Sequence, residues 1–338
     1  MRLGIDVHGG DHAPHEILKG AYAAAKKIKA DLVLYGSKEE ILKFDSSCPF
    51  EIVNCTEFIT GDDAPVEAIR RKRDSSMVRG IVDLKDKKID GFLSAGNSGA
   101  LMAGGLLRLG RLGGIERPAL AVPFPTAKEM TLLLDAGANA DVKPTSIRDF
   151  ALMGSLYKEK VMGKSNPRVA IVNIGEEAGK GNFLVKESYP LLEALPINFV
   201  GSIEGRDIPK GDIDVIVTDG FTGNVILKLG EGMAKSFGGL LKENLLSTLR
   251  GKIGTLLIKN SLIDFMKHLD YKEYGGAPLL GVKGYLAKAH GSSDAKAIMN
   301  ALYFLEKYVE SAMLEDLEKT LIERLKREEL IEKTGDSL

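Results

Sequence analysis

A strand, a glycine loop and a helix follow one another directly in the stretch Asp90–Leu109, which reads DGFLSAGNSGALMAGGLLRL. The apolar run Gly91–Ser94 is typical of a strand, and apolar residues recur at helical spacing from Ala100 onwards. The loop between them consists of Gly96, Asn97, Ser98 and Gly99. Glycines let a ligand approach the backbone, and the first-turn N–H groups of a helix favour an anion. A βα turn capped by Ser98, without any ligand, explains the same pattern. The loop matches neither GxGxxG nor a Walker A motif.

This succession recurs along the chain, and each time polar residues follow the strand. Further strands are expected at Arg2–Val7, Thr131–Leu134, Val169–Asn173 and Val215–Thr218. The polar residues that follow them are Asp11 and His12, Asp135 and Asn139, Lys180, and Asn224 with Lys228. Alternating strands and helices predict an α/β fold, with a mostly parallel sheet covered by helices on both faces. Ligands of such sheets bind at the carboxyl ends of the strands, so we expect these polar residues to converge there.

Composition limits the possible functions. The 338 residues carry a formal net charge of −1 and include no Trp. Neither a basic field nor stacking aromatics therefore indicate a nucleic-acid partner. No apolar run reaches the ~20 residues of a membrane-spanning helix, and the N-terminal residues read as a strand rather than a signal peptide. The length suits two domains or one large unit, and we expect a single domain over residues 1–338.

The segment Gly238–Asp270 is rich in aliphatic residues, with basic residues interspersed. It favours a pair of helices packed on the core or on a second copy of the chain. An amphipathic tip that touches a membrane surface or a lipid-bearing protein is the alternative. A charged helix is expected over about residues 294–333, either solvated or forming an arm to a dimer partner.

Between these two segments, Tyr274–His290 predicts two short strands that flank Lys283. His290 follows the second of them. Lys283 and His290 are candidate anion-binding or acid/base groups, because both side chains can carry or donate a proton.

Eight stretches of the chain together resemble the PlsX-type phosphate acyltransferases of bacterial phospholipid synthesis. They are GIDVHGGDHAP, SAGNSGAL, RPALA, DAGAN, NIGEEAGKG, VTDGFTGNVILK, GGAPLLGVKG and HGSSDA, in order from Gly4 to Ala295. The chain departs from the family in having His8 where Met is more frequent and Ser98 where Thr is common. Neither departure removes a polar group.

The resemblance implies a dimeric α/β fold similar to that of isocitrate dehydrogenase and phosphate acetyltransferase. It implies transfer of an acyl group from acyl-[acyl carrier protein] to inorganic phosphate, giving acyl phosphate and the free carrier protein. A membrane acyltransferase then uses the acyl phosphate to acylate glycerol 3-phosphate. The implied partners are the acyl carrier protein, a second copy of the chain and that membrane enzyme. The implied location is the cytoplasm, at the membrane periphery.

Roles for individual residues follow from loop position and side-chain chemistry. We expect phosphate to bind the loop Gly96–Gly99 and Lys180, with Asp135 and Asn139 also contacting substrate. We expect Asp11 and His12 to orient or deprotonate the nucleophile. Candidates for contact with the oxyanion or the phosphate are Asn224, Lys228, Lys283 and His290. Lysine charges would neutralise the phosphate, so no metal and no other cofactor are expected.

Three alternatives remain open at this point. A coenzyme A-dependent phosphate acyltransferase would have the same fold. An NAD-dependent decarboxylating dehydrogenase of related architecture would need a metal held by several carboxylates, which the sequence does not offer at helical spacing. A non-catalytic membrane scaffold built around Gly238–Asp270 would leave the polar loops without a purpose.

Overall fold

The protein is described from a computed structural model that covers residues 1–177, 179–269 and 275–334. Within these ranges, strands form two separate sheets rather than the one sheet that the sequence predicts. The first sheet has the order β3-β2-β1-β4-β12-β11-β5. Its strands are β1 (Arg2–Asp6), β2 (Asp31–Gly36), β3 (Glu51–Asn54), β4 (Gly91–Ser94), β5 (Ala119–Leu120), β11 (Ala277–Leu280) and β12 (Tyr285–Lys288). All neighbours pair in parallel except β11, which runs antiparallel to both β12 and β5.

The second sheet has the order β6-β7-β10-β8-β9. Its strands are β6 (Val122–Phe124), β7 (Thr131–Leu134), β8 (Arg168–Asn173), β9 (Asn198–Glu204) and β10 (Val215–Val217). Only β6 runs antiparallel to its neighbour among these described strands. The chain passes from one sheet to the other at Ala121, whose N–H donates to the carbonyl of Pro278. The apolar run that reads as one strand is therefore divided between the two sheets.

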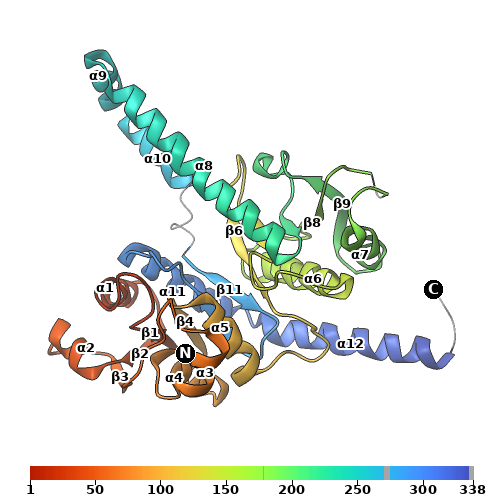
Figure 1. Cartoon of the computed structure of the whole chain (residues 1–338), viewed down its shortest axis with the longest axis horizontal. Coiled ribbons are helices and arrows are strands. Elements are labelled where there is room, and N and C mark those ends of the chain that lie inside the picture. Colours follow the sequence, from red (N-terminus) through yellow and green to blue (C-terminus); the bar gives the residue numbers. More distant parts are fainter. Residues whose placement is uncertain (178, 270–274, 335–338) are drawn as a thin grey trace.

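Helices cover the sheets on both sides (Figure 1). Those before the crossing are α1 (His15–Ala24), α2 (Lys38–Phe44), α3 (Pro65–Arg71), α4 (Ser76–Lys85) and α5 (Ser98–Gly104), which continues as a π-helical turn over Gly105–Leu109. Those after it are α6 (Pro144–Lys160), α7 (Phe183–Glu193), α8 (Gly220–Leu246), α9 (Leu249–Leu257), α10 (Lys259–Leu269), α11 (Ala295–Glu310) and α12 (Met313–Thr334). The expected α/β fold with mostly parallel strands is confirmed.

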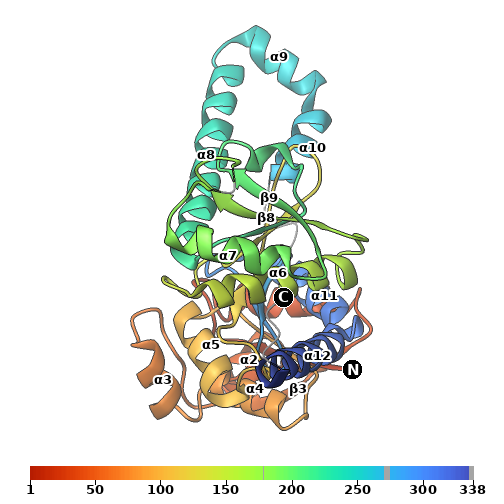
Figure 2. The same ribbon diagram turned by 90° about the vertical axis from the view of Figure 1, so that its right-hand side faces the viewer.

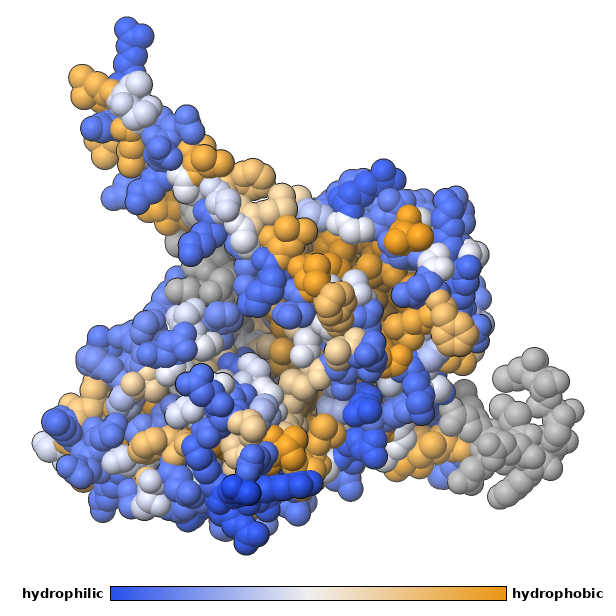
Figure 3. Space-filling model, viewed as in Figure 1, coloured by the Kyte–Doolittle hydropathy of each residue, from blue (hydrophilic) through white to orange (hydrophobic). Residues whose placement is uncertain are grey.

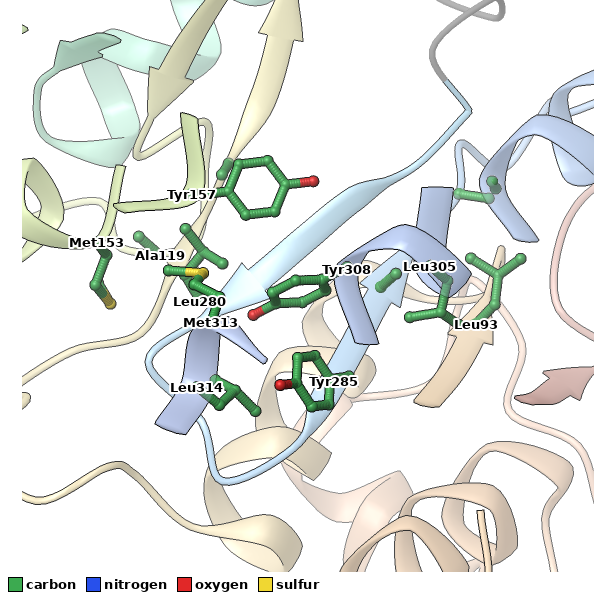
Figure 4. Close-up of a cluster of buried hydrophobic side chains, with 14 of the residues drawn as sticks. Leu93, Ala119, Met153, Tyr157, Leu280, Tyr285, Leu305, Tyr308, Met313 and Leu314 are labelled. Atoms are coloured by element: carbon green, nitrogen blue, oxygen red, sulfur yellow. The ribbon is translucent and has the colours of Figure 1, made fainter. Parts of the chain in front are cut away.

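The molecule has two halves, one built on the first sheet and one on the second. A cluster of buried side chains joins them (Figure 4). Tyr308 of α11 lies between Tyr157 of α6 and Tyr285 of β12, with ring centroids 5.3 Å and 4.7 Å apart. Both contacts are edge-to-face, the geometry that the charge distribution of aromatic rings favours. Because the three rings come from helices and strands of both halves, the cluster fixes the first sheet against α6.

Helices α8, α9 and α10 form an arm that extends away from the two sheets (Figures 1 and 2). The sequence predicts a pair of helices over Gly238–Asp270. In the structure this segment contains the end of α8, the whole of α9 and the whole of α10, and Asp270 lies outside the described residues. Among the described helices, none combines the length and apolar character that crossing a bilayer requires.

The C-terminal helix that the sequence predicts is broken into α11 and α12. Ala312 separates them with a φ of 50°, which no helix residue adopts. The first half of α12 is not simply solvated, because Leu317 and Leu321 are buried and Arg324 pairs with Asp149 at 2.6 Å.

Candidate active site

Three loops of the first sheet meet at one edge. Strands β1, β4 and β12 are adjacent and parallel, so their carboxyl ends lie together. The N–H of Asp11, after β1, donates to the carbonyl of Gly291, after β12, at 2.8 Å. A Cβ on Gly9 would lie 2.6 Å from the main-chain nitrogen of Gly96, after β4, so glycine is required at position 9. The convergence predicted for these loops is present.

Asp6 lies buried beneath these loops. Its carboxylate accepts hydrogen bonds from the hydroxyls of Ser76 at 2.6 Å and Ser94 at 2.7 Å, and from the N–H of His8 at 3.2 Å. Burial raises the pKa of Asp6, and the two serine hydrogen bonds oppose that rise. Asp6 thus ties the ends of β1 and β4 to α4. Asp6 is not among the residues that the sequence predicts for the site, although an ionisable residue inside the apolar run Arg2–Val7 is a signal for it.

Lys288, at the end of β12, is a second buried ionisable group that is not among the residues predicted for the site. Only 8% of it is exposed, and its Nζ donates to the carbonyl oxygen of Ala95 at 3.2 Å and to that of Ala289. Burial lowers the pKa of Lys288 to about 8, while the charges of Asp6 and Asp11 act in the opposite direction. Lys288 therefore joins the loops after β4 and β12 and places an amine between them.

The second sheet supplies α8, which stands on the turn that follows β7. In that turn Asp135 is fully buried, and its carboxylate accepts from the N–H groups of Leu120, Ala138 and Asn139 at 3.0, 2.9 and 2.6 Å. Burial raises its pKa. A Cβ on Gly223 would lie 1.9 Å from the carbonyl oxygen of Asp135, so only glycine lets α8 approach so closely.

Asp135 and Asn139, which the sequence predicts to contact substrate, are both held by partners within the protein. Asp135 has no exposed surface, and the Asn139 amide donates to the carbonyl of Pro118 at 2.8 Å and to Asp135 at 2.9 Å. The two side chains instead position the first turn of α8, which Asp219 caps by accepting from the N–H of Thr222 at 2.8 Å.

Asn224 and Lys228 are four residues apart on α8, so they lie on one face of the helix. Lys228 pairs with Glu231 at 2.8 Å. Burial lowers the pKa of His290, after β12, and the charge of Lys228 lowers it further. Lys228 therefore lies close enough to His290 for its charge to act on the imidazole, and the surface is recessed between the arm and the part of the molecule built on the first sheet (Figure 3). Asp11 also acts on the His290 pKa, in the opposite direction.

The loop Gly96–Gly99 is organised by Asn97 rather than by Ser98. The Asn97 side-chain oxygen caps α5 by accepting from the N–H of Ala100 at 3.0 Å, which corrects the prediction that Ser98 is the cap. The Asn97 amide nitrogen is 3.1 to 3.3 Å from carbonyl oxygens of residues 60, 61 and 63. The polar atoms of Asn97 are thus engaged within the protein, and Ser98 is exposed at the start of the helix.

The three remaining predicted residues, Lys180, Lys283 and His12, lie in three different places. Lys180 follows β8, at the carboxyl edge of the second sheet, and pairs with Glu177 at 2.9 Å. Lys283 precedes β12, whereas His290 follows it. Lys283 therefore lies at the opposite edge of the first sheet, away from the loops that carry Asp11 and His290. His12 is exposed beside Asp11. Among the residues the structure describes, no group of three His, Cys, Asp or Glu side chains is arranged to hold a metal.

Comparison with known proteins decides the family. The model of the fatty acid synthesis protein family matches residues 1–315. A phosphate acyltransferase from Alkaliphilus oremlandii is 54% identical over 322 residues, which cover 94% of this chain and 96% of that protein. One from Thermoanaerobacterium thermosaccharolyticum is 47% identical over 322 residues, covering 95% and 97%. The chain belongs to the fatty acid synthesis protein family.

Members of this family that match the chain are named phosphate acyltransferases, so the resemblance seen in the sequence is confirmed and the chain is an acyltransferase. Solved structures with a similar fold include a phosphotransacetylase from Streptococcus pyogenes, with a TM-score of 0.61 and 14% identity over 91% of this chain and 94% of that one. A phosphotransacetylase from Staphylococcus aureus gives 0.60 and 13% over the same shares. These likenesses confirm the predicted phosphate acetyltransferase-like fold.

Proposed function

We propose that this family member transfers a fatty acyl group from acyl-[acyl carrier protein] to inorganic phosphate, and that the acyl phosphate is used to make phospholipid. The observation that carries the proposal is that adjacent parallel strands bring Asp11, the loop Gly96–Gly99 and His290 to one edge of the first sheet, where the charge of Lys228 on α8 acts on His290. Cations and a titratable imidazole around a solvent-facing hollow suit a small oxyanion beside a reacting carbonyl. The name of the relatives supports phosphate as the acyl acceptor.

The chemistry needs charge stabilisation more than bond-making by the protein. A phosphate oxygen attacks the thioester carbonyl; a C–O bond forms and the C–S bond breaks. Negative charge builds on the carbonyl oxygen between these events. The Lys228 ammonium and the Asn224 amide, on one face of α8, are placed to donate to that oxygen or to the phosphate. In this proposal Lys180 approaches the phosphate from the second-sheet edge, and Ser98 and the N–H groups of its loop do so from the first.

One proton moves during the reaction. Hydrogen phosphate loses a proton as it becomes acylated, and the thiolate of the carrier protein gains one. The pKa of His290 is lowered from its ordinary value of 6.5, mainly by burial, so the imidazole is largely neutral near neutral pH. A neutral imidazole accepts the phosphate proton and returns it to sulfur. Asp11 and His12, beside it, orient the nucleophile.

The arm is the part of the molecule that we assign to partners. In α9, Leu249, Leu256 and Leu257 are 76%, 72% and 81% exposed, and basic residues lie among them. An apolar surface flanked by lysines suits an anionic membrane surface. We propose a cytoplasmic homodimer whose arms contact the membrane, where a glycerol-3-phosphate acyltransferase takes up the product.

A direct assay tests the reaction. Hexadecanoyl-[acyl carrier protein] and phosphate should give acyl phosphate and the free thiol of the carrier protein in equal amounts. ³¹P NMR measures the acyl phosphate. Acetyl-coenzyme A should be a poor donor; a preference for it would support the coenzyme A-dependent alternative. Thiol release that does not need phosphate would indicate a thioesterase and contradict the proposal.

Lysine variants on α8 make the assay specific to the site. Lys228→Ala should lower kcat/KM for phosphate about 100-fold, since one donor to a developing oxyanion has about that effect. Lys242→Ala removes an exposed lysine farther along the same helix and should leave it within about twofold. Equal effects of the two variants would mean that α8 does not contact the reacting groups.

A further inference from the structure

We infer that the carrier protein docks on a group of arginines at the end of α3, with its acyl-bearing arm directed at the loop Gly96–Gly99. These residues, the α3 arginine surface, are Arg70, Arg71 and Arg73, with Arg108 beside them. The inference rests on the proposed reaction and goes beyond it by naming the face of the enzyme that meets the donor protein.

The segment around α3 concentrates positive charge in a chain that has almost none overall. Four basic residues and one acidic residue between positions 64 and 73 leave a net charge of +3, whereas the whole chain carries −1. Arg70, Arg71 and Arg73 are exposed. Lys72 is only partly exposed, because its ammonium pairs with Asp63 at 2.6 Å. The lysine therefore holds the segment together, and the three arginines face solvent.

Contacts within the protein hold the guanidinium groups at the end of α3 and leave most of their charge uncancelled. In the part of the chain that the structure describes, the Arg70 guanidinium has no hydrogen-bond or ion-pair partner, and Arg71 pairs with Glu67 at 2.8 Å. The Nε of Arg73 donates to the carbonyl of Arg70 at 3.4 Å, and Arg108 donates to the carbonyl of the residue before it at 2.8 Å. A carbonyl accepts a hydrogen bond without cancelling a full charge, so the surface stays positive.

The same segment is fixed against the loop that we assign to phosphate. A Cβ on Gly99 would lie 2.7 Å from the Cγ of Pro65, the first residue of α3. The side-chain nitrogen of Asn97 is 3.1 to 3.3 Å from carbonyl oxygens of residues 60, 61 and 63, which lead into that helix. From Pro65 to Arg70 the helix rises about 8 Å. A donor protein held by the arginines therefore has its thioester arm alongside the loop.

A shallow pocket runs along α3 between the arginines and this loop. Its volume is about 470 Å³, within the ~300–1,000 Å³ usual for small ligands. Its lining residues are Ala64, Pro65, Val66 and Glu67 from the start of the helix, and Arg70 and Arg71 from its last turn. The arm of a carrier protein begins with a phosphodiester and continues with methyl and amide groups to the thioester. Arginine binds phosphate oxygens through two N–H groups at once, so the order of groups along the pocket matches that along the arm.

The α3 arginine surface lies away from the arm of the enzyme. Both views show α3 beside α5, at the opposite end of the molecule from α9 (Figures 1 and 2). Contacts that α9 makes with a membrane therefore do not involve these arginines. Positive charge next to a reacting loop suits a partner that delivers an acyl group to that loop, and the carrier protein is that partner in the proposed reaction.

Charge reversal tests the inference. The double variant Arg70→Glu/Arg71→Glu changes both arginines of the pocket, and neither makes a contact with another element that folding depends on. Lys43→Glu/Lys85→Glu reverses two exposed lysines, on α2 and α4, and is the matched control. With hexadecanoyl-[acyl carrier protein] as the donor, the arginine variant should raise the KM for the donor at least tenfold. The control should leave this KM within about twofold.

Two further measurements separate docking from the reaction. Hexadecanoyl-pantetheine lacks both the carrier protein and the phosphodiester, so its kcat/KM should be the same in the unmodified enzyme and both variants. Raising NaCl from about 0.1 to about 1 M shortens the screening length from ~10 Å to ~3 Å. The KM for the carrier-bound donor should rise with salt in the unmodified enzyme, and much less in the arginine variant.

Each other outcome contradicts a definite part of the inference. A KM for the carrier-bound donor that stays within about twofold in the arginine variant would overturn the docking surface. An equal loss with hexadecanoyl-pantetheine would also overturn it, since the arginines would then act on folding or on the reaction. An unchanged KM together with weaker binding to phosphatidylglycerol vesicles would assign the surface to the membrane instead.

Failure of the proposed reaction is distinguishable from failure of this inference. If the unmodified enzyme forms no acyl phosphate from the carrier-bound donor, the proposed reaction is wrong. Titration calorimetry of the carrier protein with the unmodified enzyme and the arginine variant then still tests the surface. Binding that weakens at least tenfold in the variant supports docking on α3, and equal binding by the two proteins contradicts it.

Discussion

Each of the two sheets has a buried aspartate at the carboxyl end of one of its strands. The two carboxylates accept hydrogen bonds from different kinds of donor. Asp6, at the end of β1, accepts from serine hydroxyls that belong to α4 and β4. Asp135, after β7, accepts mainly from main-chain N–H groups, two of them in its own turn. Burial raises the pKa of both. The first carboxylate thus connects separate elements, whereas the second shapes one turn.

The difference shows how this fold divides its work. The Asp135 turn is the base on which α8 stands, and Asn224 and Lys228 lie farther along that helix. At the first sheet the connecting groups, Asp6 and Lys288, lie directly beneath the loops that carry Asp11 and His290. A substitution at the second edge should therefore act on stability, and one at the first edge on the site as well.

The largest effect is expected from Asp135→Ala. It leaves the N–H groups of Leu120, Ala138 and Asn139 without their acceptor, which should lower the free energy of unfolding by about 4 kcal/mol. Urea denaturation measures this. Asp141→Ala, an exposed aspartate on the same loop, is the control and should change little. A loss below about 1 kcal/mol would show that the turn does not depend on the carboxylate.

The next effect depends on pH. The pKa of Lys288 is lowered from 10.5 to about 8. Between these values the unfolded chain holds a proton that the folded chain has lost, so the free energy of unfolding should rise with pH. The full window corresponds to about 3 kcal/mol. Lys288→Met should lack this rise, and the difference between the two proteins should grow between pH 8 and 10.5.

Urea denaturation of both proteins at several pH values checks this. Lys283→Met, an exposed lysine on the same hairpin, should follow the unmodified protein at each pH. A difference between Lys288→Met and the unmodified protein that stays constant from neutral to alkaline pH would mean that the buried amine does not titrate in this range.

Asp6→Asn should have an effect of about 2 kcal/mol on unfolding, because the amide nitrogen cannot accept from one of the two serines. The same change should raise the KM for phosphate about tenfold, since it loosens the loops around Asp11. Asp31→Asn, exposed at the start of β2, provides the baseline. The comparison of the two edges breaks down if Asp6→Asn costs stability and leaves the KM as it was.

The smallest effect on the free energy of unfolding is expected for two tyrosines of the buried cluster, Tyr308 and Tyr285. Both lie away from the carboxyl edges of the two sheets, so they serve as a reference for the larger effects. Within the described residues the buried hydroxyl of Tyr308 has no hydrogen-bond partner, whereas that of Tyr285 bonds Glu315 at 2.9 Å. Tyr308→Phe should leave the free energy of unfolding unchanged or raise it by up to about 1 kcal/mol, and Tyr285→Phe should lower it by about 1 kcal/mol. Thermal unfolding distinguishes the two signs, and the opposite order would contradict these contacts.

Much of the fold could be predicted from the sequence, since β4 and β7 begin and end at the expected residues. The crossing at Ala121 could not, because Leu120–Phe124 reads as one apolar run and only the tertiary pairing with Pro278 divides it. The break at Ala312 also lacks a signal, since no glycine or proline marks it.

The sequence places three residues of the proposed site, Asp11, His290 and Lys228, by one criterion: a polar residue that follows a strand. Asp6 and Lys288 could not be found by that criterion, because they belong to the strands themselves. Lys283 and Lys288 are five residues apart, yet they lie at opposite edges of the sheet. Which of the two lysines lies beside the loops after β1 and β4 depends on the direction of β12, and pairing with β4 sets that direction only in the folded chain.

The central claim is that α8 and the first-sheet loops act on one substrate. A double-mutant cycle with Lys228→Ala, His290→Ala and the double variant tests it through kcat/KM for phosphate. If both side chains serve one transition state, the double variant should be at least about tenfold more active than the product of the single effects predicts. Single effects that simply multiply would contradict the account.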